Sequence, residues 1–446
     1  MRILKIIHGY PPRYNAGSEV YSQMLCRALA KRHEVHVFTR EENPFEPDFS
    51  LRLEADGTTG VMLHLINIPQ EKFRYRYQHL EVDKALIEVL EGVKPHIVHI
   101  GHLNHLSTSL VAELAKRKIP MVYTLHDYWL MCPRGQFIQR NPPANEGLWT
   151  LCDGQEHQKC AERCYAGYFS GAMDEEKQDV AYWTDWVKRR MEHIRGLTQH
   201  IQMFIAPSHY LYQRYVQDFQ LPLKKLLYVD YGFDLNRLEN RHRVPHEPFT
   251  FGYIGTHIPA KGIQDLLRAF ASVKGNSRLR LWGRTRAQNT EGLQSIVKTL
   301  PEPIQKRLEW RSEYSNENIV EDVFNQVDCI VVPSIWVENS PLVIHEALQL
   351  RIPVITANAG GMAEYVKHEQ NGLLFEHRTI QSLATQMQRL AEDPLWAKRL
   401  GSRGYLQSSD GNVPSLEEHI DRMETIYHGL LEPSFESLTG VSYGTA

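Results

Sequence analysis

The chain has 446 residues, so a single compact core is not expected and two domains are the starting expectation. Hydrophobic residues make up 42%, charged residues 23%, and the mean hydropathy is -0.42, which is typical of a globular protein and excludes disordered, collagen-like and fibrous chains. The formal net charge is -3 and neither half has a basic excess, so we expect no nucleic-acid partner.

Membrane and export segments are not expected either. No run approaches the roughly 18 consecutive apolar residues of a membrane span. Polar His8 and Pro11-Pro12 follow the first apolar residues, which predicts a strand and not a signal peptide. With six cysteines and no export signal, the predicted location is cytoplasmic.

Short β-rich runs alternate with helical patterns along the whole chain. In the first half we predict strands over 3–7, 35–39, 61–68, 97–100, 121–125 and 204–206, and helices over 18–30 and 83–90. In the second half we predict strands over 249–254, 279–282, 329–332 and 354–356, and helices over 263–273, 318–326, 342–350, 380–390 and 415–430. This alternation predicts right-handed βαβ units and parallel sheets.

These series define the predicted domains. We expect an N-terminal Rossmann-like domain over 1–236, with a cysteine-containing insertion over 131–165, and a C-terminal Rossmann-like domain over 249–431. A polar, proline-bearing segment over 237–248 is the predicted linker, and 432–446 the predicted tail. The predicted fold class is α/β, with two doubly wound parallel-sheet domains facing a cleft, where open α/β sheets bind ligands.

Three strand-to-helix loops carry residues suited to phosphate and sugar. The loop before 20–30 contains Gly17, which either allows backbone N–H groups to approach a phosphate or serves as a turn before an N-cap at Ser18. In 252–262, Lys261 is expected in the first turn of a helix, where a cation is favourable if an anion binds beside it; a solvated surface lysine is the alternative.

The third loop, 333–347, is the most informative. A helix is expected to begin near Pro341, at the first helical position, so that the free amides of Leu342 and Val343 point outward. Glu338 precedes this helix and Glu346 lies on it. A helix N-terminus for phosphate and two carboxylates for hydroxyl groups suit a nucleotide-sugar, although any two exposed acids on a surface helix remain the plain alternative.

A family resemblance rests on these residues. The pattern Glu338-x7-Glu346, with Gly360-Gly361 and Asn371-Gly372 after it, resembles the donor-binding half of the retaining glycosyltransferases of family 4, which have the GT-B fold. The resemblance extends over most of residues 1–400, and further motifs that carry it are Phe251-Gly-Tyr-Ile-Gly255, Lys261-Gly262, Gly17, Thr124-Leu-His126-Asp127 and Ala206-Pro207-Ser208.

The resemblance implies roles for individual residues. Lys261 would neutralise the diphosphate, Glu338 would hold hydroxyls of the transferred sugar, and His126 would lie near the sugar or the acceptor. The implied catalytic residues are thus Lys261, Glu338 and His126; the implied donor-binding residues are Gly17, Gly255, Thr256, Gly283, Arg284, Asn339, Leu342, Val343 and Glu346, with Glu346 on the ribose.

Two departures from the family pattern matter. Thr256 and His257 stand where these enzymes often carry an arginine, so Arg284 would complete the phosphate clamp; Asp230-Tyr-Gly232-Phe-Asp234 replaces the usual Pro-Asn-Gly-Val-Asp. No Asp-x-Asp motif stands at a predicted strand end, so no catalytic metal and no required cofactor are expected.

Four cysteines lie in the insertion: Cys132, Cys152, Cys160 and Cys164. Three interpretations stay open, which are a structural zinc site, disulfides and structural thiols, because the spacing is not that of a standard zinc finger. Cys26 and Cys329 are predicted to be core residues of a helix and a strand.

The acceptor side is less defined by sequence. Arg13, Arg74, Arg76 and Arg134 are candidate residues for a sugar phosphate or a lipid diphosphate, with solvated surface arginines as the alternative. The segment 180–194, which contains Trp183 and Trp186, either packs in the core or contacts anionic lipid as an amphipathic helix. The second interpretation would place the protein peripherally at the inner membrane face.

By this resemblance the sequence indicates a metal-independent hexosyltransferase that retains anomeric configuration. The first candidate donor is UDP-glucose, and the candidate acceptors are a sugar, a sugar phosphate as in sucrose-phosphate synthase, and a lipid-linked glycan. Two alternatives stay open, namely a nucleotide-sugar epimerase of the same fold and an inactive sugar-nucleotide-binding scaffold.

Overall fold

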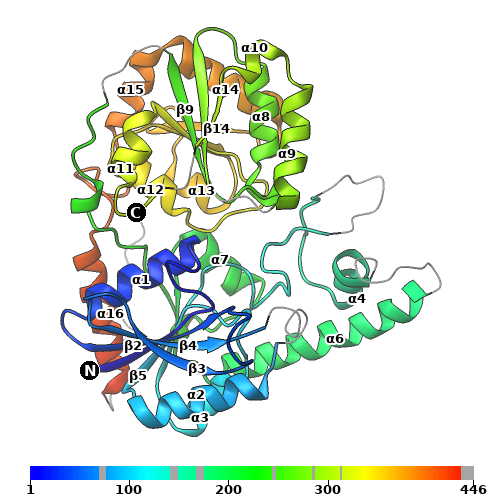
Figure 1. The fold of residues 1–446 in the computed structure, drawn as a ribbon, viewed down its shortest axis with the longest axis vertical. Helices are drawn as coiled ribbons and strands as arrows, with labels where there is room; N and C mark the ends of the chain where they lie inside the picture. Colours follow the sequence, from blue (N-terminus) through cyan, green and yellow to red (C-terminus); the bar gives the residue numbers. More distant parts are fainter. Residues whose placement is uncertain are drawn as a thin grey trace. The chain divides into compact units, whose positions relative to one another are not determined.

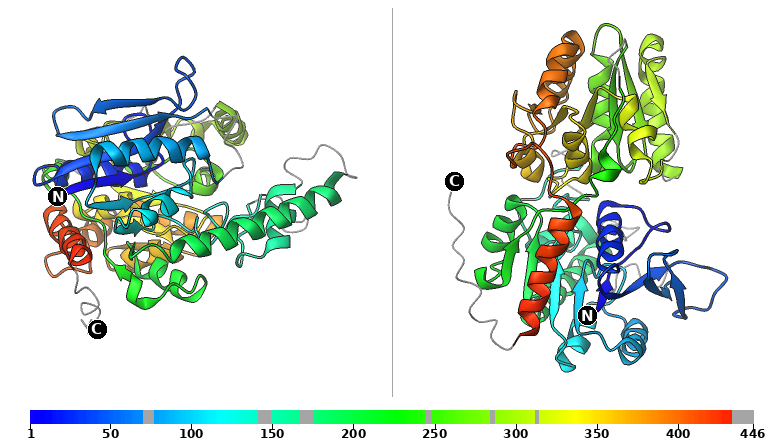
Figure 2. Two further views of the ribbon diagram at one scale, coloured as in Figure 1. Left: turned by 90° about the horizontal axis from the view of Figure 1, so that it is seen from below. Right: turned by 90° about the vertical axis from the view of Figure 1, so that its left-hand side faces the viewer.

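The chain forms two compact units, which are described separately (Figures 1 and 2). The computed structural model describes residues 1–69, 77–140, 149–166, 175–243, 248–283, 287–311 and 314–432. The first unit comprises Met1–Gly135, Asp153–Gly232 and Leu416–Ala446, and the second comprises Gln136–Cys152 and Phe233–Ser415. Each unit contains one sheet.

The first unit is built on an eight-stranded sheet in the order β3-β4-β2-β1-β5-β6-β7-β8. Its strands are β1 (Arg2–Ile6), β2 (Glu34–Glu41), β3 (Leu51–Ala55), β4 (Val61–Asn67), β5 (Ile97–Ile100), β6 (Met121–Thr124), β7 (Met203–Ala206) and β8 (Leu226–Tyr228). All neighbouring strands are parallel except β3 and β4. The four-residue strands β5, β6 and β7 are entirely buried, as expected for a parallel sheet covered on both faces.

The first unit also contains helices. They are α1 (Gly17–Leu29), α2 (Leu80–Val93), α3 (Leu110–Lys116), α4 (His157–Cys160), the π-helical turn η2 (Ala161–Tyr165), α6 (Glu175–Thr198), α7 (His209–Gln217), η3 (Leu223–Lys225) and α16 (Leu416–Leu431). Figure 2 shows that α6 is a long straight helix that continues past the edge of the sheet, with α4 packed against it.

The second unit has a six-stranded, fully parallel sheet in the order β11-β10-β9-β12-β13-β14. Its strands are β9 (Phe249–Ile254), β10 (Ser277–Trp282), β11 (Leu308–Trp310), β12 (Cys329–Val332), β13 (Val354–Ala357) and β14 (Gly372–Phe375). Its helices are η4 (Asn236–Leu238), η5 (Pro259–Lys261), α8 (Ile263–Ala271), α9 (Ala287–Thr299), α10 (Glu302–Gln305), α11 (Ile319–Asp322), η6 (Phe324–Gln326), α12 (Leu342–Gln349), α13 (Gly360–Tyr365), α14 (Ile380–Glu392) and α15 (Pro394–Ser402).

Four strands that the sequence did not predict, β3, β8, β11 and β14, complete the sheets. All four are edge strands, with β3 and β8 at the two edges of the first sheet and β11 and β14 at the two edges of the second. The sequence of β3, Leu-Arg-Leu-Glu-Ala, has charged residues at every second position, and those of β8 and β11 have only three residues each. Strands of this kind bury little apolar surface, so their hydrophobic pattern is weak.

The helix α16 belongs to the first unit, and this differs from the predicted C-terminal domain of 249–431. Tyr21 Oη lies 2.9 Å from His419 Nε2, and His99 Nδ1 lies 2.7 Å from Tyr427 Oη. The helix therefore packs beside α1 through buried polar contacts that no local pattern could reveal.

The segment expected to be a linker, 237–248, also differs in its described part. Arg243 forms a two-point ion pair with Asp328, both bonds being 2.6 Å long, and Arg241 Nη2 donates to the carbonyl oxygen of Val327 at 2.8 Å. These arginines fix the segment to the second unit by ion pairing and hydrogen bonding, whereas Glu239, Asn240 and His242 of the same segment are exposed. Of the predicted tail, 433–446 lies outside the described residues.

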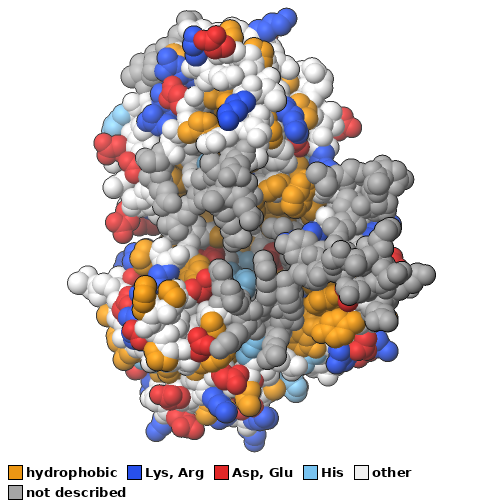
Figure 3. Space-filling model, turned by 45° about the vertical axis from the view of Figure 1, so that its right-hand side comes forward, with side chains coloured by type: hydrophobic (Ala, Val, Ile, Leu, Met, Phe, Trp, Pro, Cys, Tyr) orange, Lys and Arg blue, Asp and Glu red, His pale blue; other side chains and the backbone are white. Residues whose placement is uncertain are grey.

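The apolar interior includes several predicted positions. Cys26 and Cys329 are buried, as predicted. On α6, Trp183 and Val187 are buried together with Met191 and Ile194, which favours the interpretation of this stripe as core. No helix among the described residues is long and apolar enough to span a membrane. On the face drawn in Figure 3, the coloured acidic and basic side chains are interspersed.

The buried imidazoles of the first unit predict a pH-dependent stability. Burial lowers the pKa of His419 to about 4 and that of His99 well below its ordinary value. In the unfolded chain a histidine binds a proton near pH 6.5, so the folded state is stabilised above that pH and loses stability as the pH falls from 6.5 towards 4.

We expect the melting temperature to fall between pH 7 and pH 5, measured by circular dichroism. The lowered pKa of His419 alone should reduce the free energy of unfolding at pH 5 by about 2 kcal/mol, compared with its value well above pH 6.5. The variant His419→Gln should show a shallower fall than the original chain. Identical pH profiles for the two proteins would contradict the assigned neutral state of His419.

Candidate functional site

Two loops meet at the carboxyl ends of β9 and β12, which are neighbours in the second sheet. The loop after β9 leads through η5 into α8, and the loop after β12 leads into α12. The amides of Ile335 and Trp336 both donate to the carbonyl oxygen of Ala260, at 3.0 and 3.3 Å. Backbone hydrogen bonds therefore hold the two predicted functional loops against each other.

This arrangement brings Lys261 and Glu338 together. Lys261 Nζ donates to Glu338 Oε1 at 2.9 Å, and the hydroxyl of Ser334 donates to the same carboxylate oxygen. The ammonium group also lies 5.4 Å from the centre of the Trp336 ring. Glu338 is buried, whereas Lys261 remains partly exposed, so the cation is available to an anion from solvent while the carboxylate is held in place.

The sequence suggested that Lys261 lies in the first turn of a helix, but it does not lie in α8. It ends the short helix η5, and α8 begins only at Ile263, after Gly262 in a left-handed conformation with φ of +70°. A Cβ atom at Gly262 would lie 1.9 Å from the carbonyl oxygen of Pro333. Only glycine permits both this conformation and the close approach of the two loops.

A second close approach involves Gly361. Its amide donates to the carbonyl oxygen of Glu338 at 2.9 Å, and a Cβ atom there would lie 1.3 Å from the carbonyl oxygen of Asn339. Asn339 and Glu338 thus run directly against the N-terminal turn of α13. The glycine therefore fixes the main chain at the position where the carboxylate of Glu338 is placed.

The helix α12 begins at Leu342, with Pro341 as its N-cap residue. Pro341 was expected at the first helical position, and it lies one residue earlier because its ψ of 118° is extended and not helical. The amide of Ile344 donates to Pro341. The amides of Leu342 and Val343 are in the first turn, where no carbonyl group of the helix itself can accept from them.

Glu346 lies about one turn into α12 and is paired. Arg237 Nη2 donates to Glu346 Oε1 at 2.6 Å, and both side chains are largely buried. Arg237 was not singled out in the sequence because it lies in the segment interpreted as a linker. Its charge and its position after the Gly-Phe-Asp stretch gave no separate signal.

Two further predicted donor residues, Gly255 and Gly283, lie at the same end of the second sheet. Gly255 and Gly283 follow β9 and β10, and a Cβ atom at Gly283 would lie 1.9 Å from the carbonyl oxygen of Gly255. The carbonyl oxygen of Thr256 accepts from Tyr253 Oη at 3.0 Å. Arg284 lies outside the described residues.

In the first unit, His126 follows β6 and is enclosed by aromatic rings. His126 Nδ1 lies 2.7 Å from Tyr231 Oη, and the Tyr21 ring lies 5.4 Å from the imidazole, edge to face. Desolvation lowers the pKa of His126 well below its ordinary value. The imidazole is therefore neutral near pH 7 and suited to hydrogen bonding with a hydroxyl group.

Other polar side chains that the sequence did not indicate gather at the ends of β1 and β5. His102 Nδ1 accepts from the amide of Asn104 at 2.9 Å, so Nε2 carries the hydrogen directed to Asp127 Oδ2 at 3.3 Å. The His8 ring lies 4.6 Å from the His102 ring, edge to face. The strand order β1-β5-β6 joins these residues, which are separated widely in sequence.

His8 in turn contacts Glu19 in the first turn of α1. His8 Nε2 lies 3.2 Å from Glu19 Oε1, and the hydroxyl of Ser18 donates to Glu19 Oε2 at 2.7 Å. Burial alone would raise the pKa of Glu19, but its contacts with His8 and Ser18 lower it to about 2. Gly17, the first residue of α1, is exposed beside this carboxylate.

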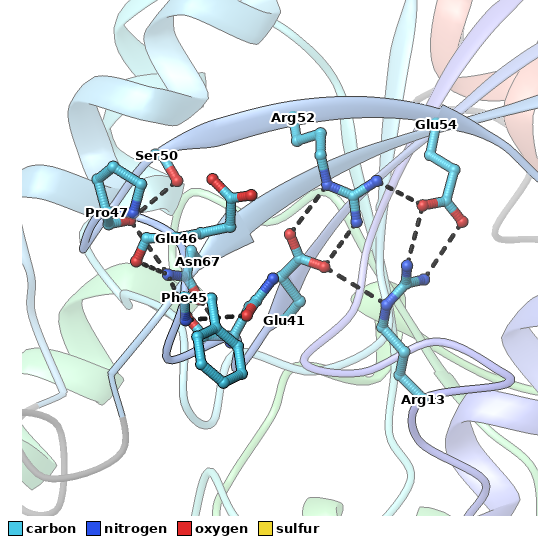
Figure 4. A network of polar contacts seen from close by, with 10 residues as sticks. Arg13, Glu41, Phe45, Glu46, Pro47, Ser50, Arg52, Glu54 and Asn67 are labelled. Carbon is cyan, nitrogen blue, oxygen red and sulfur yellow. Dashed lines mark hydrogen bonds and ion pairs between the residues drawn. The ribbon is translucent and has the colours of Figure 1, made fainter.

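Of the four candidate arginines of the acceptor side, the structure describes Arg13 and Arg134. Arg13 donates to both oxygens of Glu54 at 3.3 and 2.9 Å, and Arg52 pairs with Glu41 and Glu54 (Figure 4). The charge of Arg13 is therefore neutralised by carboxylates of β2 and β3, because β3, which the sequence did not predict, lies beside it. Arg134 is partly buried, whereas Arg74 and Arg76 lie outside the described residues.

The zinc interpretation of Cys132, Cys152, Cys160 and Cys164 is not supported. Among the described residues, which include all four cysteines, no group of three or more His, Cys, Asp or Glu side chains is arranged to hold a metal ion. Cys132 follows the turn at Tyr128, whereas Cys152 bonds through its amide to Phe137. The four cysteines therefore do not form a metal site in the part of the chain that the structure describes.

Two units, each built on a largely parallel α/β sheet, have the architecture of the GT-B class of glycosyltransferases. A family model described as Glycosyltransferase Family 4 matches residues 16–237, and one described as Glycosyl transferases group 1 matches residues 236–407. The chain belongs to the family 4 type of GT-B glycosyltransferases.

Two curated glycosyltransferases match part of the chain. The capsular polysaccharide biosynthesis glycosyltransferase CapM of Staphylococcus aureus is 25% identical over 219 residues, which are 46% of this chain and 52% of CapM. The D-inositol 3-phosphate glycosyltransferase of Rhodococcus jostii is 31% identical over 123 residues, which are 28% of this chain and 25% of that protein. These matches thus span about half, or less, of the relatives' own length.

Solved structures share the fold over nearly the whole chain. Sucrose-phosphate synthase from Thermosynechococcus elongatus has a TM-score of 0.68 at 18% identity, with 96% of this chain and 98% of that chain covered. HepE from Anabaena, solved in complex with UDP and glucose, has a TM-score of 0.64 at 16% identity, with 96% and 99% covered.

We expect Gly361→Ala to lower the stability of the second unit by about 3 kcal/mol, because the added methyl group overlaps the carbonyl group of Asn339. The matched control is Gly292→Ala on α9, where no heavy atom of the described residues lies within 4 Å of the new Cβ atom. That variant should be neutral or slightly stabilised, since alanine favours helix. Equal melting temperatures for the two variants would contradict the close approach at Gly361.

Proposed function

We propose that this protein transfers a hexose from a nucleoside diphosphate sugar to a carbohydrate acceptor with retention of anomeric configuration. The observation that carries the proposal is the ion pair between Lys261 and Glu338 beside the N-terminus of α12. A partly exposed ammonium group and the first-turn amides of Leu342 and Val343 supply positive charge for a diphosphate.

Three side chains of this site would each bind a different part of the donor. Glu346 accepts hydrogen bonds from the ribose, Lys261 compensates the diphosphate, and Glu338 accepts from hydroxyl groups of the transferred sugar. Gly17, Gly255, Thr256, Gly283, Arg284 and Asn339 are the further proposed contacts. UDP-glucose is the first candidate donor, which is supported by the presence of UDP-glucose in a HepE structure.

Transfer is proposed to proceed by attack on the face from which the diphosphate departs. The bond from the anomeric carbon to the acceptor oxygen forms as the bond to the phosphate oxygen breaks, and the acceptor proton passes to that phosphate oxygen. Lys261 stabilises the negative charge that develops on the leaving group, a role in which charge placement contributes several kcal/mol.

The acceptor is proposed to bind the first unit. His126, neutral and held by Tyr231, and Asp127, oriented by His102, offer hydrogen-bonding groups at the carboxyl end of the sheet. The candidate acceptors are a sugar, a sugar phosphate and a lipid-linked glycan. CapM is named for capsular polysaccharide biosynthesis, and another relative is named for transfer to a diphosphoundecaprenol-linked sugar, which supports the third class.

The proposal is tested with a panel of UDP, ADP and GDP sugars, each incubated with and without glucose, fructose 6-phosphate and a lipid-linked disaccharide. Nucleoside diphosphate release and product mass are measured by liquid chromatography and mass spectrometry, with and without EDTA. Acceptor-dependent release supports transfer. Acceptor-free conversion to an isomeric donor indicates an epimerase, and binding without turnover indicates an inactive scaffold; loss of activity in EDTA would contradict the role given to Lys261.

We expect Lys261→Ala to lower turnover at least 100-fold, because it removes the cation opposite the leaving diphosphate. The matched control is Lys306→Ala, which removes a lysine from an exposed pair with Glu302, both side chains being more than 70% exposed. That control should keep full turnover, since exposed ion pairs contribute little. Similar rates for both variants would refute the role of Lys261.

A further inference from the structure

The ion pair between Arg237 and Glu346 is a feature of the donor-binding unit that the proposed reaction does not itself use. Arg237 belongs to η4, and Glu346 to α12, 109 residues later. We propose that Arg237 is a positioning residue, which fixes the carboxylate of Glu346 so that it recognises the ribose of the donor. This inference rests on the proposed function and extends it to a residue outside the predicted donor set.

The guanidinium group connects two segments of the second unit beside Glu346. Nη2 donates to Glu346 Oε1 at 2.6 Å, and Nη1 donates to the carbonyl oxygen of Asn316 at 2.8 Å. Asn316 lies in the segment between β11 and α11. Arg237 therefore ties the carboxylate on α12 to the chain that follows β11, and it restricts where the carboxylate can point.

Tyr314, from the same segment, lies close to this pair. Burial raises the pKa of the Tyr314 phenol, the nearby charge of Glu346 raises it further, and the charge of Arg237 acts in the opposite direction. The carboxylate thus has a cation and a phenol as neighbours. Among the described residues, Arg237 is its hydrogen-bond partner and engages Oε1, so Oε2 keeps its capacity to accept from a hydroxyl group.

Stability alone gives a poor account of this pair. The side chains of Arg237 and Glu346 are only 11% and 9% exposed, so both charges are largely removed from water. The desolvation of two such charges offsets most of their attraction, and replacing a buried ion pair with apolar residues is often neutral or stabilising. What the pair does provide is a defined carboxylate geometry, because a bond to the planar guanidinium restricts the rotamers of the glutamate.

This arrangement predicts a particular selectivity. When Arg237 holds Glu346 through Oε1, Oε2 accepts from a ribose hydroxyl in one geometry, so the loss of the 2′-hydroxyl leaves Oε2 without its partner. A carboxylate that is free to rotate would instead accept a hydrogen bond from water, whether or not the nucleotide carries a 2′-hydroxyl. Arg237 should therefore determine the preference for a ribonucleotide over its 2′-deoxy counterpart more than it determines overall affinity.

The experiment measures binding by isothermal titration calorimetry at pH 7.5. UDP, ADP and GDP are first titrated into the purified full chain, and the tightest binder is then compared with its 2′-deoxy form. We expect the original chain to prefer the ribonucleotide about tenfold or more, the range for a hydrogen bond to a charged group. In Arg237→Gln the ratio should fall to within about twofold of unity, and in Arg237→Lys it should take an intermediate value.

A matched control separates positioning from stability. Arg243→Gln removes a different buried ion pair of the same unit, the pair with Asp328. We expect this variant to melt at a lower temperature but to keep the tenfold preference. Glu346→Gln should lose the preference, and the double variant Arg237→Gln with Glu346→Gln should lose no more than either single variant, since the two residues act on one interaction.

The outcomes distinguish this inference from the proposed function. If the original chain binds none of the three nucleotides, the proposed function fails and the role of Arg237 fails with it. If it binds and Arg237→Gln weakens both nucleotide forms equally, the residue is merely structural and only this inference is overturned. Should Arg237→Gln not fold, the same comparison in Arg237→Lys decides, because an unchanged ratio there also overturns the proposal.

Discussion

The second unit depends on the close approach of two loops at neighbouring parallel strands, β9 and β12. Backbone hydrogen bonds to Ala260 join them, and glycine at positions 262 and 361 allows main chain to lie where a side chain would otherwise intrude. This contact sets the distance between Lys261 and Glu338 before any ligand is present. A preorganised cation and carboxylate need little rearrangement on binding, which is the usual basis of electrostatic recognition in enzymes.

The parts of this arrangement that a sequence can reveal are those that lie close along the chain. Glu338 and Glu346 are eight positions apart around a helix start, so the sequence places both near the N-terminus of α12, and their common role in a donor site stays a prediction. The loop motif Lys261-Gly262 indicates a functional lysine. Its exact place at the end of η5 depends on the left-handed conformation of Gly262, which a helical pattern in the sequence does not reveal. The buried parallel strands of both sheets were likewise evident from short apolar runs.

What escaped prediction depends on contacts between distant segments. Arg237 lies in a segment with the polar composition of a linker, and its partner Glu346 is 109 residues away in the sequence. His8 and His102 become neighbours only through the strand order of the first sheet, and Arg13 is neutralised by Glu54 of a strand too polar to recognise. The four cysteines show the converse, since proximity in sequence suggested a metal site that is not found among the described residues.

The return of α16 to the first unit has a consequence for biosynthesis. Tyr21 and His99 receive their partners from residues 398 and 328 positions further along the chain. During synthesis, the N-terminal sheet emerges with these polar groups and the adjoining apolar face uncovered, and it remains so while the whole second unit is translated. Contacts of such long range are slow to form, and incomplete intermediates expose surface that promotes association. The first unit therefore cannot be completed until Leu416–Leu431 has been translated, which delays the burial of its interior.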